Sequence, residues 1–106
     1  MTNLINQKCM GHKQIVALTQ KEIKNYLSEL KEGWKLKVVK IEKLFNFDDF
    51  NKAMEFVNKI AELAEREGHH PDIEIHYNKV EIILWTHAIG GLSENDFILA
   101  AKIDNI

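Results

Sequence analysis

Histidine is the residue type whose number and spacing point most directly to chemistry in this sequence. Four of the five histidines lie in one short stretch, at His69, His70, His76 and His87. An ordinary imidazole has a pKa of about 6.5, so it can donate or accept a proton near neutral pH. The stretch from 69 to 87 is therefore where acid–base chemistry should be sought.

The residues around these histidines predict a long helix followed by a β-hairpin. Gly68 is placed to take the left-handed conformation that ends a helix, and Pro71 prevents the helix from resuming. Apolar and polar residues then alternate on both sides of Asn78-Lys79, which predicts two strands joined by a tight turn there. This register places His70 opposite His87, with Cβ atoms roughly 5 Å apart. We therefore expect histidines from distant parts of the chain to converge.

An aromatic side chain, Trp85, would lie beside these imidazoles, and the combination suggests acid–base work on a flat, ring-shaped ligand. Structural interpretations of the same residues stay open. The partial negative charge at the carboxyl end of the long helix favours the protonated form of a nearby imidazole, which alone could account for His69 and His70. Asp96 follows Ser93 at the spacing of a capping box, which satisfies backbone groups without any catalytic role. His76 opposite Glu81 is expected to be a polar pair between strands.

Zinc binding and nucleophilic catalysis are the competing kinds of chemistry. A zinc site accepts several histidines, but His69 and His70 are adjacent rather than one helical turn apart, and HExxH and CxxC motifs are absent from the sequence. Cys9 lies in the N-terminal stretch, no serine stands in a nucleophile-elbow motif, and His12 is assigned no role. We therefore expect no metal.

Length and charge narrow the class of protein. The chain has 106 residues and a formal net charge of −2, without a basic run that could neutralise a row of phosphates. It also lacks the roughly 18 consecutive apolar residues of a membrane span and the features of a signal peptide. We predict one domain over residues 1–106, with 1–14 a loosely held terminus, in the cytoplasm and without direct nucleic-acid or membrane contact.

Three helices and four strands are expected in the order αββαββα. A capping box at Thr19 begins the first helix, Asn46 or Asp48 caps the second, and Ser93 caps the third. Residues 34–45 alternate as two short strands or one bent strand. The predicted fold class is α+β: a single domain with a four-stranded antiparallel sheet and three helices on one face.

Several motifs stand in a fixed order along the chain. They are Glu65-x-x-x-His69-His70-Pro71, Tyr77-Asn78-Lys79-Val80, Thr86-His87 and Gly91-Leu92-Ser93-Glu94-x-Asp96. Together they resemble the motifs of the pterin-4a-carbinolamine dehydratase family. The resemblance covers roughly residues 15 to 104, and the family's order of helices and strands is similar to the one predicted here.

The resemblance implies an enzyme, a hydro-lyase that converts 4a-hydroxytetrahydrobiopterin to quinonoid dihydropterin and water in tetrahydrobiopterin recycling, without a cofactor or metal. By position it implies that the catalytic residues are His69, His70 and His87. From the chemistry, we expect His69 and His87 to be the acid and the base, in either assignment, and His70 to orient substrate. The substrate-binding residues implied are Gly68, His69, His70, Trp85, Thr86, His87 and Ala88, supported by Glu65 and Asp96.

The resemblance also implies a homodimer or homotetramer. Joining sheets edge to edge would cover an edge strand that is otherwise exposed, so we expect at least a dimer. The alternative function, from another class, is a dimeric protein-interaction module, similar to a transcriptional coactivator, on the same fold. Three converging histidines favour the enzyme, because a binding module does not need them.

Overall fold

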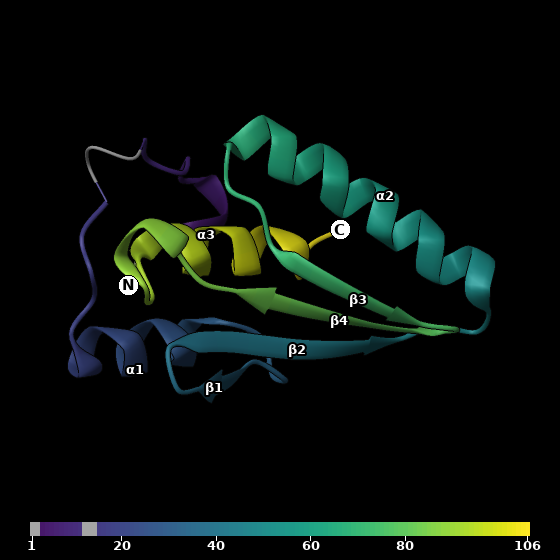
Figure 1. Cartoon of the computed structure of the whole chain (residues 1–106), viewed down its shortest axis with the longest axis horizontal. Coiled ribbons are helices and arrows are strands. Elements are labelled where there is room, and N and C mark those ends of the chain that lie inside the picture. Colours follow the sequence, from purple (N-terminus) through teal and green to yellow (C-terminus); the bar gives the residue numbers. More distant parts are fainter. Residues whose placement is uncertain (1–2, 12–14) are drawn as a thin grey trace.

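The computed structural model describes residues 3–11 and 15–106 and has the predicted order of helices and strands (Figure 1). The helices are α1 (Gln20–Glu29), α2 (Phe50–Glu67) and α3 (Glu94–Ile103), and the strands are β1 (Lys35–Lys37), β2 (Lys40–Asn46), β3 (Asp72–His76) and β4 (Lys79–Leu84). Two short 3-10 turns, η1 (Leu4–Asn6) and η3 (His87–Ile89), lie before α1 and after β4.

The strands form one antiparallel sheet in the order β1-β2-β4-β3. Figure 1 shows α2 running along the sheet, with α3 packed beside it. Ile23 of α1, Ile60 of α2, Ile82 of β4 and Phe97 of α3 belong to a single buried cluster between helices and sheet. Burial of such side chains drives folding. The predicted α+β fold class is confirmed.

Side-chain caps begin the first two helices. Thr19 and Glu22 form the predicted capping box, each side chain accepting the other residue's backbone N–H. The cap of α2 is Asp49, whose carboxylate accepts a backbone N–H from the first turn. The predicted caps Asn46 and Asp48 were wrong because β2 continues through Asn46, so the helix begins later.

The β3–β4 hairpin turns one residue earlier than the predicted Asn78-Lys79. His76 lies opposite Lys79, so the turn consists of Tyr77-Asn78, with Tyr77 at a φ of 55°. Contacts with Phe47 hold this turn: the Asn78 side chain donates to the Phe47 carbonyl at 3.0 Å, and the Phe47 N–H donates to the Asn78 carbonyl at 2.8 Å. The connection between β2 and α2 therefore sets the position of the turn.

The shifted turn corrects two predicted residue pairs. His70 is not paired with His87, because the pairing of β3 begins only at Asp72. His76 faces a lysine rather than Glu81. Val80, Ile82 and Leu84 stay on the buried face of the sheet, because side chains alternate with a period of two and the register differs by two residues. Tyr77, expected on the same face, lies in the turn instead and is 66% exposed.

A buried polar cluster fastens the C-terminal end of α3 to the sheet. Asp104, whose side chain is 2% exposed, accepts from Lys43 Nζ at 2.6 Å and from the Trp34 indole N–H at 2.9 Å. The Lys43 ammonium also lies 5.8 Å from the centre of the Trp34 ring. These contacts neutralise a carboxylate at the negative end of the helix dipole.

Candidate active site

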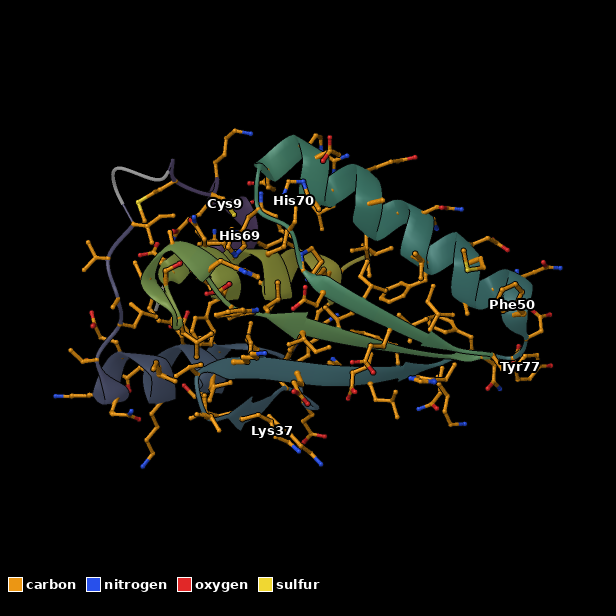
Figure 2. All side chains as sticks on the ribbon, viewed as in Figure 1. Cys9, Lys37, Phe50, His69, His70 and Tyr77 are labelled. Atoms are coloured by element: carbon orange, nitrogen blue, oxygen red, sulfur yellow. The ribbon has the colours of Figure 1, made fainter. Side chains whose placement is uncertain are left out.

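A cavity of about 400 Å³ lies where α2 and β4 end. All of the predicted substrate-binding residues line it, namely Gly68, His69, His70, Trp85, Thr86, His87 and Ala88. The rest of the lining comes from Met10, Gly11, Ile15, Pro71, Asp72 and Asn95. Figure 2 shows His69 and His70 at this end of α2, with Cys9 nearby. The histidines predicted to converge therefore do border one cavity.

Backbone turns at two places present these histidines. Gly68 ends α2 in the left-handed conformation, with a φ of 68°, and so turns the chain out of the helix as predicted. After β4, the Thr86 N–H donates to the Gly91 carbonyl at 2.7 Å and closes a short loop. The 3-10 turn inside that loop begins at His87, which places its ring at the cavity.

His69 is paired with a buried carboxylate. Its Nε2 lies 2.6 Å from Asp96 Oδ1, and the two side chains are 11% and 0% exposed. The other carboxylate oxygen accepts the Thr86 hydroxyl at 2.8 Å and the Ser93 N–H at 2.9 Å. Thr86 and Ser93 also share a hydrogen bond of 2.7 Å. Asp96 therefore both caps α3, as the structural interpretation expected, and orients a cavity imidazole.

His70 has a very different partner. Its Nε2 lies 2.6 Å from Glu65 Oε2, but the side chains are 60% and 78% exposed. Water competes for both groups, and exposed pairs of this kind contribute little stability. Of the two adjacent imidazoles, His70 is therefore the exposed one with an exposed partner, and His69 is the buried one with a buried partner.

The third cavity histidine lies against an aromatic ring. The centres of the His87 and Trp85 rings are 3.9 Å apart, at an angle of 35°. The Trp85 indole N–H donates to Asp72 at 3.3 Å, and the Lys40 ammonium lies 4.7 Å from the indole centre. These contacts fix the indole as one wall of the cavity.

The sequence did not anticipate that the N-terminal segment would reach this cavity. Residues 3–11, within the predicted loose terminus, are attached to the domain: Leu4 is buried, and the Met10 N–H donates to Asn95 Oδ1 at 2.7 Å. The contacting residues are 85 positions apart, so no local pattern identifies them. The one available signal was Asn95, a polar residue in the first turn of α3, just before its apolar stretch. His12 lies outside the described residues.

Residues 3–11 and 15–106 show neither a metal-binding group of side chains nor a membrane-spanning helix. In this part of the chain no three His, Cys, Asp or Glu side chains are grouped so that they could hold a metal ion. None of its helices is long and apolar enough to cross a membrane.

Known proteins resemble this chain over nearly its whole length. Residues 16–106 match the family described as Pterin 4 alpha carbinolamine dehydratase. A protein of Alkaliphilus metalliredigens named as a pterin-4-alpha-carbinolamine dehydratase is 45% identical over 106 residues, which is 98% of this chain and 96% of that protein. One of Acidobacterium capsulatum, named likewise, is 55% identical over 87 residues, or 82% and 94% of the two chains.

A solved structure agrees with these sequence matches. The crystal structure of a transcriptional coactivator/pterin dehydratase from Brucella melitensis has a TM-score of 0.80 and 34% identity, and the match covers 85% of this chain and 97% of that one. Fold and relatives together define an α+β hydro-lyase. The chain belongs to the pterin-4-alpha-carbinolamine dehydratase family, which confirms the resemblance seen in its motifs.

Proposed function

We propose that this protein dehydrates a 4a-hydroxytetrahydropterin to quinonoid dihydropterin and water, with histidines as acid and base. The product would re-enter tetrahydrobiopterin recycling after aromatic amino acid hydroxylation. The observation that carries the proposal is the His69–Asp96 pair at a cavity also lined by His70 and His87, in a chain of this family.

The reaction needs one proton donor and one proton acceptor. The bond between C4a and the hydroxyl oxygen breaks as that oxygen takes a proton and leaves as water. The N5–H proton is removed, and its electron pair forms the C4a–N5 double bond, so nothing is oxidised or reduced. Groups that exchange protons near neutral pH suit both steps. His69 and His87 are the proposed pair, and a proton returned between them or through solvent resets the site.

Asp96 supports this role of His69 by fixing the ring. The carboxylate accepts donors at Oδ2 from Thr86 and Ser93, which leaves Oδ1 to accept the imidazole Nε2–H. The neutral ring then has its lone pair on Nδ1, which becomes the atom that exchanges protons with substrate. A base oriented by a third buried group is a recurring arrangement in acid–base enzymes.

Substrate orientation is proposed for the remaining cavity side chains. The pterin is flat, and the Trp85 indole is a fixed aromatic surface beside His87. Offset stacking on such a ring is favourable. His70, exposed beside Glu65, would contact the polar edge of the ring system.

Stopped-flow measurement of the decay of 4a-hydroxytetrahydropterin absorbance tests the catalytic proposal. We expect His69→Ala and His87→Ala each to lower the catalysed rate at least about 100-fold. His76→Ala is the matched control, because His76 is an exposed histidine on β3 that does not line the cavity. Equal rates for the wild type and all variants would refute the assignment.

We also propose that the protein is at least a dimer and acts in the cytoplasm. β1 and β3 are the outer strands of the sheet, and Ile75 of β3 is 39% exposed. Edge-to-edge pairing would satisfy the free backbone groups of such strands. Light scattering at micromolar concentration should give at least twice the chain mass, and a particle of 12.3 kDa would contradict the proposal.

A partner-binding role is the second candidate, favoured by the description of the Brucella melitensis relative as a transcriptional coactivator as well as a pterin dehydratase. The two candidates differ in what the cavity histidines do. A binding module without catalysis would leave the decay of 4a-hydroxytetrahydropterin at its uncatalysed rate, whatever its oligomeric state.

A further inference from the structure

The N-terminal segment, residues 8–11, is bound to the rim of the cavity by a buried amide. Asn95 is 1% exposed. Its side chain accepts the Met10 N–H at 2.7 Å and donates to the Met10 carbonyl at 3.0 Å, so both polar groups of one peptide residue are satisfied. Met10 and Gly11 themselves line the cavity.

A second anchor lies one residue earlier. The Cys9 N–H donates to Glu67 Oε1 at 2.9 Å, and the other oxygen of that carboxylate accepts from Lys102 at 2.8 Å. The Lys8 ammonium donates to the carbonyl of Arg66 at 3.2 Å. The segment is therefore held by the end of α2 and by α3.

These anchors are neighbours of the proposed catalytic residues. Asn95 directly precedes Asp96, and Glu67 lies two residues before His69. A shift of α2 or α3 that displaced the anchors would also disturb the His69–Asp96 pair. The segment and the imidazoles thus share the same two helix ends, and the segment closes one side of a cavity whose volume suits a small-molecule site.

We propose that Asn95 is a positioning residue, which fixes Met10 and Gly11 as a wall that contacts the bound pterin. This inference rests on the proposed function, because it takes a pterin as the ligand. The role of Asn95 is in binding: the wall limits where the flat ring can lie, whereas the proton transfers belong to the histidines. Loosening the wall should therefore weaken substrate binding more than it slows the chemical step.

Cys9 offers a direct report on whether the segment is attached. It is the single cysteine of the chain, and its thiol lies 3.7 Å from the Asn95 carbonyl, to which it donates. Burial, followed by the negative charge of Glu67, raises the pKa of Cys9 to about 12. The thiolate is the reactive form, so the attached segment suppresses alkylation, and release should restore it.

The test compares Asn95→Ala with wild type and with Asn105→Ala, a matched control at the exposed far end of α3. For Asn95→Ala we expect an increase in KM for 4a-hydroxytetrahydropterin of about tenfold, with kcat within about twofold. Alkylation of Cys9 by iodoacetamide, followed by mass spectrometry, should be at least about tenfold faster. Saturating dihydrobiopterin should slow alkylation in the wild type.

Met10→Pro is the second variant, because it removes the backbone N–H on the segment's side and leaves α3 unchanged. If Asn95→Ala does not fold, Met10→Pro takes its place in the test. Met10→Pro should itself raise the KM for 4a-hydroxytetrahydropterin and the rate of Cys9 alkylation. Faster alkylation with an unchanged KM would show that the segment is no part of the substrate site and would overturn the inference, as would unchanged alkylation in both variants. A wild type without dehydratase activity that is still protected by dihydrobiopterin would refute the proposed reaction and leave the inference standing.

Discussion

Helix α3 carries a buried carboxylate at each end, and the two have different partners. At the N-terminal end, Asp96 is fully buried and pairs with His69 at the cavity. At the other end, Asp104 pairs with Lys43 and Trp34 against the sheet. The helix dipole favours the first carboxylate and opposes the second.

The partner decides what each carboxylate can do. A lysine ammonium ordinarily keeps its proton at neutral pH, whereas an imidazole gives it up or takes it there. The pair of Lys43 with Asp104 is therefore structural, whereas the proposed proton exchange needs a pair such as His69 with Asp96. If the proposal holds, burial alone does not distinguish a structural carboxylate from one that serves the reaction.

The largest expected effect is on the rate, at the cavity end of α3. Asp96→Asn should lower kcat at least about 100-fold, because an amide that donates toward His69 favours the wrong tautomer of the ring. Stopped-flow kinetics on the folded variant measure this loss. A kcat within about twofold of the wild type would show that Asp96 only caps the helix.

The opposite end should affect stability instead. Asp104→Asn leaves the Lys43 ammonium, 13% exposed, without its counter-charge, and we expect the free energy of unfolding to fall by about 3 kcal/mol. Urea denaturation gives this value, and kcat should stay within about twofold. If kcat fell as far as in the Asp96 variant, the contrast between the two ends would be lost.

An intermediate effect is expected at Thr86, whose hydroxyl donates to Asp96, the carboxylate at the cavity end of α3, and shares a hydrogen bond with Ser93. Thr86→Val keeps the shape of the side chain but removes both hydrogen bonds. The free energy of unfolding should fall by about 1 to 2 kcal/mol, and kcat by about tenfold. Thr86→Ser keeps the hydroxyl and should recover most of both; a serine variant as slow as the valine variant would argue against the hydrogen bond as the cause.

The smallest effect concerns a third acidic residue, Glu67, paired with Lys102. Burial raises the pKa of Glu67, but hydrogen bonds from Lys102 and the Cys9 N–H outweigh it and lower the pKa below its ordinary value of 4.5. The resulting stability is complete above pH 4.5 and is lost as the pH falls through the lower pKa of the folded chain.

Glu67→Gln should therefore destabilise the protein by about 1 kcal/mol at neutral pH, and the difference from the wild type should shrink below pH 4.5. Urea unfolding from pH 7 to pH 3 measures it. A difference that is constant with pH would show that the charge of Glu67 is irrelevant. The charge of Glu67 would then contribute nothing to stability, unlike the charge that we expect Asp104 to contribute through Lys43.

The sequence predicted correctly those features that depend on residues close together in the chain. The caps at Thr19 and Ser93 were predicted because their hydrogen bonds span only a few residues. The convergence of His69, His70 and His87 followed from the hairpin and from the family motifs. Asn95 was missed because its partner comes from a segment without any periodic pattern, and the start of α2 was missed because strand pairing extends β2.

The turn held by Asn78 and Phe47 has a consequence for how this hairpin is specified. A shift of the strand register by two residues leaves each strand side chain on the same face of the sheet, because side chains alternate with a period of two. The predicted and observed hairpins therefore bury the same residues of β4, namely Val80, Ile82 and Leu84, and the hydrophobic pattern of that strand does not distinguish the two registers. The hydrogen bonds between Asn78 and Phe47 form at the observed turn, and they favour the observed register over one two residues away. Polar contacts at the turn therefore determine a register that burial of apolar side chains leaves open.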